Sequence, residues 1–150
     1  MPNLKEGDKA PAIKAKDENG KETTLKQFRG KKLILYFYPK DDTPACTQEA
    51  CNFRDNFSLL KEKGYEVVGV SPDSSESHKT FIAKFKLPFR LIADENKKVI
   101  NDYGVWGLKK LYGREYMGLH RKIFVIDEKG YIEKIVQKVL TKKAVQQTLK

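Results

Sequence analysis

Two cysteines, Cys46 and Cys51, are the only thiols in this chain of 150 residues, and they lie five residues apart. They follow the apolar run LILYFY and the step Thr43-Pro44. Proline favours the first position of a helix, which makes Thr43 the expected N-cap residue. Cys46 then falls in the first turn, where unpaired backbone N–H groups and the helix dipole stabilise a thiolate. The sequence therefore predicts a reactive thiolate at Cys46.

Cys51 is expected further along the same helix, away from its positive end. Two thiols in different environments suggest an attacking thiol and a resolving thiol, and two cysteines with two histidines are few ligands for a zinc site. Helical residues five apart have Cα atoms roughly 8–9 Å apart, whereas a disulfide needs about 4.4–6.8 Å. A disulfide between these cysteines is therefore expected to require unwinding of the first helical turns.

The rest of the chain alternates between strand and helix patterns. Asn19-Gly20, between two alternating segments, predicts an N-terminal β-hairpin, followed by a short helical turn over 25–30. An apolar stripe formed by Ala50, Phe53, Phe57 and Leu60 predicts one helix over 44–63. Buried strands are expected at 32–38, 65–71 and 89–94, helices at 74–86, 96–104 and from 141 onward, a second hairpin at 121–136, and an ordered loop at 105–119.

These elements predict an α/β fold with a central mixed β-sheet flanked by helices. A cysteine that begins a helix directly after a buried strand suggests the thioredoxin-like arrangement. We expect residues 1–150 to form a single domain, since domains commonly contain about 100–150 residues.

Composition and charge limit the classes of function. Charged residues make up 33% of the chain and the net charge is +10, but lysines and acids are interleaved along its length. This pattern favours a solvated surface over a specific nucleic-acid site. No apolar run is long enough to cross a membrane, and the N-terminus lacks the apolar segment of a signal peptide. These features predict a cytoplasmic protein, in which two cysteines are more often catalytic than structural.

The cysteine segment resembles a known family. PKDDTPAC, from Pro39 to Cys46, fits the Pro-x-x-x-Thr-x-x-Cys signature of peroxiredoxins. YFYPKDDTPACTQEACNFRD is similar to the Q-type group, also called bacterioferritin comigratory proteins. GDKAP near the start, YGVWG from Tyr103 and HRKIFVIDEKGYI from His120 extend this resemblance over nearly the whole chain.

The resemblance implies a thioredoxin-like peroxidase domain that uses no metal, haem or other cofactor. Cys46 resembles the peroxidatic cysteine, which reduces hydrogen peroxide and alkyl hydroperoxides, and Cys51 resembles the resolving cysteine. Thioredoxin or a similar dithiol is the implied reductant. The implied oligomeric state is a monomer or a weak homodimer.

Four further residues acquire roles through the resemblance. Thr43 resembles the hydroxyl that helps to hold the peroxide, and Pro39 the proline that shields the site. Arg121 resembles the arginine that faces the thiolate, and Glu49, three residues after Cys46, could fix that arginine through an ion pair. From sequence alone, these residues could equally be a helix cap, a strand end, a surface arginine and a surface acid.

Other interpretations stay open. His78 and His120 have no evident partner in the sequence and are assigned no role. A thiol–disulfide oxidoreductase would normally carry C-x-x-C, which this chain lacks. A basic binding module and a redox sensor that passes oxidation to a partner protein are the remaining alternatives.

Overall fold

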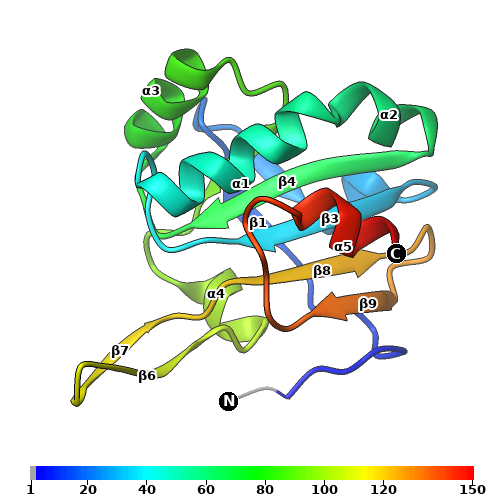
Figure 1. Ribbon diagram of the computed structural model, residues 1–150. Helices are drawn as coiled ribbons and strands as arrows, with labels where there is room; N and C mark the ends of the chain where they lie inside the picture. Colours follow the sequence, from blue (N-terminus) through cyan, green and yellow to red (C-terminus); the bar gives the residue numbers. More distant parts are fainter. Residues whose placement is uncertain (1–2) are drawn as a thin grey trace.

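The strand β3 (Lys32–Phe37) lies at the centre of a mixed sheet because its residues are apolar on both faces. It pairs in parallel with β4 (Tyr65–Ser71) and antiparallel with β8 (Lys122–Ile126). The computed structural model describes residues 3–150 and places these strands in a seven-stranded sheet with the order β2-β1-β5-β4-β3-β8-β9. The predicted mixed α/β fold is confirmed (Figure 1).

The remaining strands complete this sheet from both ends of the chain. The N-terminal hairpin consists of β1 (Lys14–Lys16) and β2 (Glu22–Thr24), as Asn19-Gly20 predicted. The 3-10 helix η1 (Leu25–Phe28) follows it. β5 (Arg90–Ala93) pairs in parallel with β4, and the predicted second hairpin is formed by β8 and β9 (Ile132–Val136).

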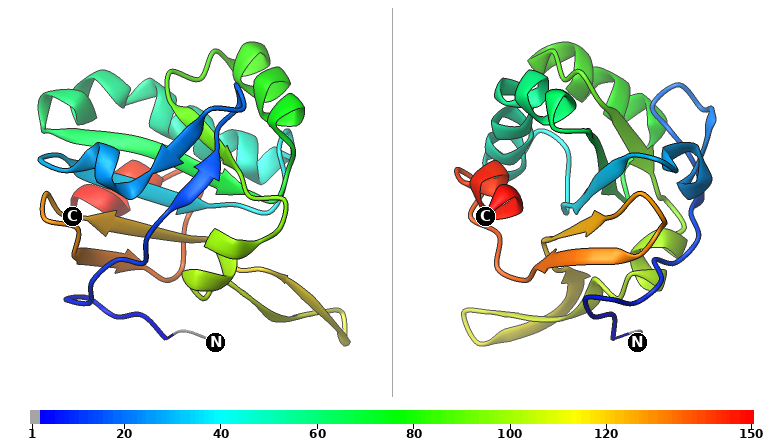
Figure 2. Two further views of the ribbon diagram at one scale, coloured as in Figure 1. Left: turned by 180° about the vertical axis from the view of Figure 1, so that it is seen from behind. Right: turned by 90° about the vertical axis from the view of Figure 1, so that its right-hand side faces the viewer.

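Helices and the N-terminal segment cover opposite faces of the sheet. One face packs against α1 (Pro44–Asp55), α2 (Phe57–Glu62), α3 (Ser75–Phe85) and α5 (Ala144–Leu149). The other face packs against α4 (Lys98–Asp102) and residues 10–13, and the views from behind and from the side follow the N-terminal chain across it (Figure 2). Alternate residues of β3 therefore enter two separate cores.

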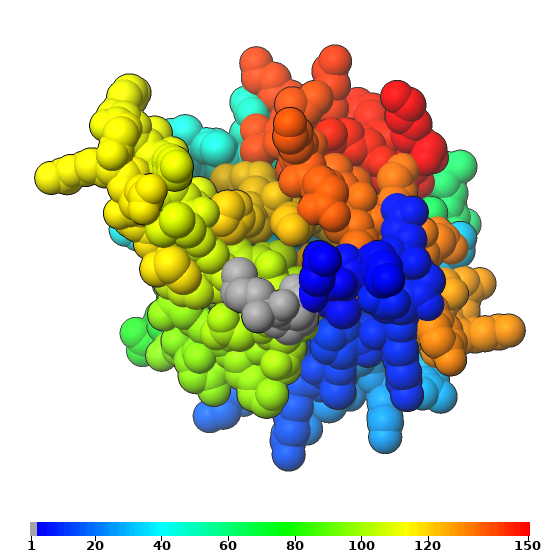
Figure 3. All heavy atoms as spheres, turned by 90° about the horizontal axis from the view of Figure 1, so that it is seen from below, coloured from blue at the N-terminus to red at the C-terminus, as the bar shows by residue number. Residues whose placement is uncertain are grey.

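Residues 105–119, predicted as an ordered loop, instead form mostly a separate hairpin. β6 (Trp106–Leu111) pairs with β7 (Arg114–Leu119) around Tyr112-Gly113, both of which have positive φ. Most of its residues are exposed or half-buried, so the one-sided apolar alternation that predicts a strand is weak here. The space-filling view shows the hairpin projecting from the body of the molecule (Figure 3).

The helix predicted over 44–63 is also divided. α1 ends at Asp55, and Asn56 separates it from α2 with φ −110° and ψ 11°. The Asn56 amide donates to the Asn52 carbonyl, a local side-chain bond that competes with continuation of the helix. The apolar stripe continues across this break, which explains why periodicity alone predicted one helix.

The helices of residues 3–150 include none that is both long and apolar enough to span a bilayer.

Candidate active site

The first turn of α1 places Cys46 at one end of the sheet. Thr43 is the N-cap and Pro44 begins the helix, as predicted, and the Cys46 side chain is only 1% exposed. An N-cap threonine is also expected to accept a hydrogen bond from an N–H of the first turn, and this prediction is wrong. Within the described chain, the Thr43 hydroxyl does not accept from a helical N–H but donates to the Lys40 carbonyl at 2.9 Å. The first-turn amides are therefore not blocked by the Thr43 side chain.

Arg121 joins the site from the segment just before β8. One guanidinium nitrogen lies 3.2 Å from the Cys46 Sγ, and another donates to Glu49 at 2.6 Å. Cys46 and Glu49 are three residues apart on α1 and therefore lie on the same helical face. The planar guanidinium contacts both groups at once, which a lysine amine could not do with the same fixed geometry. The structure thus brings together three residues that the sequence separates by up to 75 positions.

The ionisable side chains of this site are more deeply buried than is usual for such residues. Glu49 is fully buried, and burial raises its pKa to about 7 even though Arg121 acts in the opposite direction. Burial also opposes the charge of Arg121, but Glu49 and Cys46 more than compensate, so its pKa is raised. Arg121 therefore stays positive beside the thiol, whereas the charge of Glu49 is sensitive to pH near neutrality.

Two buried polar atoms near the site have no hydrogen-bond partner within the described residues: the Glu49 Oε2 and the Tyr36 hydroxyl. Burial, followed by the nearby Glu49 and Cys46, raises the pKa of Tyr36 well above its usual value. Tyr36 is therefore neutral. Its ring stacks on Phe53 with centroids 4.8 Å apart, which closes the helix-facing core behind the cysteine.

Cys51 is further along α1 than Cys46 and is half-buried, and both thiols are free. The helix is continuous through both positions. By standard helix geometry, their Cα atoms are then roughly 8–9 Å apart and their side chains point in different directions. The two sulfurs cannot be joined while α1 keeps this form.

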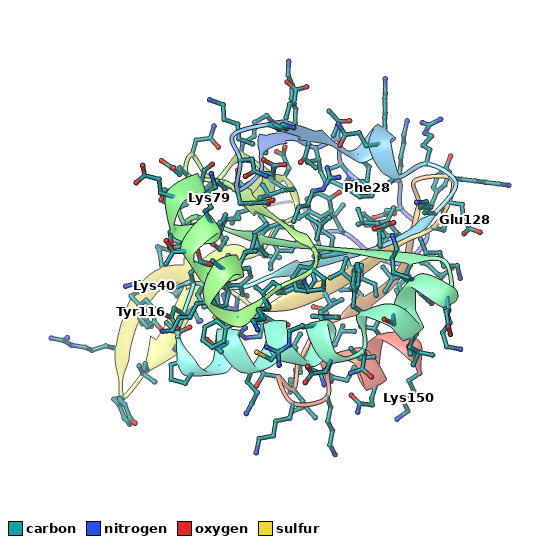
Figure 4. All side chains as sticks on the ribbon, turned by 90° about the horizontal axis from the view of Figure 1, so that it is seen from above. Phe28, Lys40, Lys79, Tyr116, Glu128 and Lys150 are labelled. Carbon is teal, nitrogen blue, oxygen red and sulfur yellow. The ribbon has the colours of Figure 1, made fainter. Side chains whose placement is uncertain are left out.

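The other site residues that were inferred from sequence lie on the loop before α1. Pro39 is half-buried and begins the segment 39–43, and Thr43 ends it. Within the described residues, neither side chain forms a hydrogen bond with Cys46, Arg121 or Glu49. Lys40 of this loop and Tyr116 of β7 lie at the same end of the molecule, whereas Glu128 lies at the far end (Figure 4).

Sequence analysis missed two residues, Asp41 on this loop and His78 on α3. His78, for which no partner was evident, is completely buried and contacts Asp41 with its Nδ1 at 2.7 Å. Asp41 stands inside the PKDDT segment, but nothing in the spacing links it to a histidine 37 residues away. The one sequence signal that could have placed His78 inside is its position in the first turns of the helix predicted over 74–86.

Comparison with known proteins agrees with this geometry. Residues 6–135 match the AhpC/TSA family. The chain is 45% identical over 143 residues to peroxiredoxin Bcp of Bacillus subtilis, covering 95% of this chain and 91% of that protein. It is 43% identical to peroxiredoxin Bcp of Escherichia coli strain K12 over 135 residues, or 90% and 86% of the two chains. This chain belongs to the peroxiredoxin family.

Solved peroxiredoxin structures share the fold. A cysteine-to-serine mutant of Xanthomonas campestris peroxiredoxin Q superposes with a TM-score of 0.86 at 31% identity, covering 91% of this chain and 87% of that one. A cysteine-to-serine mutant of Xylella fastidiosa PrxQ gives a TM-score of 0.92 at 26% identity, covering 99% and 95%. The resemblance to Q-type peroxiredoxins is thus confirmed, and it supports a thiol peroxidase function.

Proposed function

We propose that this peroxiredoxin reduces hydrogen peroxide and organic hydroperoxides to water and alcohols, with Cys46 as the attacking thiol. The observation that carries the proposal is the contact between the Arg121 guanidinium and the Cys46 Sγ at 3.2 Å, in the first turn of a helix. A permanent positive charge and helical N–H groups both favour a thiolate over a thiol. The thiolate is the form that attacks peroxide.

In the first step, the Cys46 sulfur attacks one peroxide oxygen and the O–O bond breaks. The second oxygen leaves as hydroxide or alkoxide and takes up a proton to give water or alcohol. Cys46 becomes a sulfenic acid. Arg121 stabilises the negative charge before and during this step, and Glu49 holds the guanidinium in place through its 2.6 Å bond. Burial of the cluster strengthens both interactions.

Thr43 and Pro39 act on the substrate side in this proposal. The Thr43 hydroxyl already uses its proton in the bond to the Lys40 carbonyl. Its lone pairs remain available, so we expect it to accept a hydrogen bond from the peroxide rather than to donate one. Pro39 has no N–H and, half-buried at the start of the loop, limits the access of water to the thiol.

Cys51 completes the catalytic cycle as the resolving thiol. Its sulfur attacks the Cys46 sulfenic acid, which releases water and forms an intramolecular disulfide. Because α1 holds the two residues apart, the first turns must unwind for this step. An external dithiol then reduces the disulfide by exchange and is itself oxidised. The family implies a thioredoxin-like reductant.

The remaining features of the proposal follow from this cycle. All reacting atoms come from one stretch of one chain plus Arg121, so a single domain and a monomer suffice, with no metal or other cofactor. The disulfide must be reduced after each turnover, which suits a reducing compartment, and we place the protein in the cytoplasm.

Turnover assays test this function. We expect the native protein to consume hydrogen peroxide continuously in the presence of dithiothreitol or thioredoxin, and the Cys46→Ser variant to consume none. Reduction of insulin disulfides should be negligible, which separates a peroxidase from a general oxidoreductase. Absence of peroxide consumption by the native protein, or equal consumption by Cys46→Ser, would reject the proposal.

A further inference from the structure

A buried polar cluster on the other side of the loop 39–43 anchors that loop to the body of the protein. The cluster consists of Asp41 on the loop, Asp73 after β4, His78 and Ser77 on α3, and Tyr38 and Ser71. The polar atoms of Asp41, Asp73 and His78 lie within 4.8 Å of one another. These residue types also bind metal ions, but here their atoms are engaged in hydrogen bonds among themselves and with their neighbours. The cluster is therefore a hydrogen-bonded network that joins the loop to β4 and α3.

Asp41 is the centre of this cluster. One carboxylate oxygen accepts from the Tyr38 hydroxyl at 2.6 Å. The other oxygen lies 2.8 Å from the Ser77 hydroxyl and 2.7 Å from the His78 Nδ1. The Asp41 backbone N–H donates to the Asp73 carboxylate at 2.8 Å. Both the side chain and the main chain of this one loop residue are thus fixed.

The contact made by the second ring nitrogen of His78 shows how many protons His78 and Asp41 hold between them. Its Nε2 lies 2.8 Å from the Ile92 carbonyl, and because a carbonyl can only accept, Nε2 must carry a hydrogen. The short Nδ1–Asp41 contact requires one further proton between the two groups. Asp41 and His78 therefore share that proton and form a pair of zero net charge. With the histidine fully buried and the Asp41 side chain 4% exposed, little water can replace either partner.

This anchor lies on the segment whose movement the catalytic cycle requires. Asp41 is three residues before Pro44, where α1 begins, and five before Cys46. Asp42 has a left-handed backbone with φ 57°, which its neighbours must hold in place. If α1 unwinds so that Cys46 can meet Cys51, the chain before it must shift as well, and the bonds of Asp41 resist that shift.

We propose that Asp41 and His78 are positioning residues that set how readily the first turn of α1 unwinds. They thereby set the time between formation of the Cys46 sulfenic acid and its reaction with Cys51. The mechanistic part rests on the proposed peroxidase function. A tight anchor keeps Cys46 beside Arg121 for attack on peroxide. A loose anchor releases Cys46 sooner and shortens the life of the sulfenic acid, which a second peroxide would otherwise oxidise to sulfinic acid.

Amide hydrogen exchange on the reduced protein, without peroxide, tests the anchor independently of catalysis. In Asp41→Ala and in His78→Ala we expect the amides of residues 40–50 to exchange about tenfold faster or more, since buried charge-assisted hydrogen bonds are lost. Asp41→Asn can still accept from Tyr38 and donate to the His78 Nδ1, so its exchange should stay within about threefold of the native rate. Val99→Ala, which empties part of the core on the opposite face of the sheet, controls for general loss of stability.

A second measurement relates the anchor to chemistry. After repeated turnover with excess peroxide, mass spectrometry should find about tenfold less sulfinic acid per turnover in Asp41→Ala than in the native protein and in Val99→Ala. If residues 40–50 exchange no faster in Asp41→Ala and His78→Ala than in Val99→Ala, or if Asp41→Asn exchanges as fast as Asp41→Ala, the inference is wrong. Faster exchange in Asp41→Ala and His78→Ala, found together with no peroxidase activity in the native protein, would instead reject the proposed function and leave the anchor intact.

Discussion

Glu49 is a buried acid whose surroundings determine its charge. It is fully buried with one carboxylate oxygen bonded to Arg121 and the other without a partner in the described chain. An acid on a predicted helix would ordinarily be assigned to the solvent-facing side. Here it faces inward because Arg121 supplies a partner for it. The same bond orients the guanidinium toward Cys46.

The pH dependence of stability should reveal this residue. Burial raises the pKa of Glu49 from 4.5 to about 7, so between these values the folded protein holds a proton that the unfolded chain has lost. The free energy of unfolding therefore falls as the pH rises through this window, by an amount on the order of 3 kcal/mol. Glu49→Gln should lack this fall, which urea unfolding of the reduced proteins at pH 5, 6, 7 and 8 would detect.

Glu66→Gln provides the matched control for that experiment. Burial opposes ionisation of Glu66, but Lys61 and Lys31 outweigh it and lower its pKa. Its ionisation therefore stabilises the folded protein, but this contribution changes with pH only at and below 4.5. Between pH 5 and 8, Glu66→Gln should lower the free energy of unfolding evenly and leave the slope of the pH profile as in the native protein. Parallel profiles for the native protein and Glu49→Gln would show that Glu49 does not titrate in this range.

Much of the site could be predicted at this scale. Cys46, Cys51 and Thr43 stand in one short segment with a recognisable spacing, and Arg121 followed from resemblance. The bond between Asp41 and His78 could not be predicted, because it joins two elements that only the folded sheet brings together. The direction of the Thr43 hydroxyl could not be predicted either. A threonine before a helix can accept from a helical N–H or donate to a nearby carbonyl such as that of Lys40, and the sequence does not distinguish the two.

At the scale of elements, α1 is held at both ends of its reactive stretch. Asp41 fixes the chain before it, and Asn52, the residue directly after Cys51, fixes its other end. The Asn52 side chain donates to the Lys142 carbonyl at 3.2 Å and accepts from the Val145 N–H at 2.9 Å, which ties α1 to the segment that leads into α5. Unwinding can thus be confined to the residues between these two anchors.

Three neighbouring strands support the core beneath α1. Tyr36 on β3, Gly69 on β4 and Leu91 on β5 are paired side by side across the sheet. The Tyr36 ring lies directly over Gly69. A Cβ at position 69 would lie 2.7 Å from the Leu91 Cδ2 and 2.9 Å from the Tyr36 Cζ. Any side chain there must displace the aromatic ring that packs against Phe53 of α1.

Gly69→Ala should therefore lower the free energy of unfolding by about 1–3 kcal/mol, because overpacking of a close-packed core is costly. Gly118→Ala on β7 is the matched control. Its added Cβ would lie 2.9 Å from the Lys109 Cδ, a flexible side chain that can move aside, so the loss should stay within about 0.5 kcal/mol. Urea unfolding compares the two variants, and equal losses would contradict this account of Gly69.

The elements that sequence could predict are those with a clear apolar pattern or a clear turn or cap signal. The central strands are apolar on both faces, α3 begins after the Ser74 cap, and the N-terminal hairpin turns at Asn19-Gly20. The hairpin β6–β7 could not be predicted because much of it is exposed on both faces, and the break at Asn56 because it interrupts the backbone but not the apolar stripe. Packing decides the first group, and local backbone bonds decide the second.

At the scale of the whole molecule, the net charge of +10 should govern encounters with a protein reductant. With an acidic thioredoxin-like protein we expect the rate constant for disulfide reduction to fall about tenfold between low and physiological salt, because salt screens electrostatic steering. Dithiothreitol, which is uncharged at pH 7, provides the control and should show little change. Equal salt dependence with both reductants would exclude steering by the basic surface.

The central claim is that Cys46 attacks peroxide and Cys51 resolves the product. The most direct test treats reduced Cys51→Ser protein with one equivalent of hydrogen peroxide in the presence of dimedone, which traps sulfenic acid. Digestion and mass spectrometry then locate the adduct. The account predicts one dimedone adduct on the peptide that carries Cys46, and, in the native protein treated alike, a Cys46–Cys51 disulfide without an adduct. An unmodified Cys46 in Cys51→Ser, or a native protein that forms the adduct but no disulfide, would contradict it.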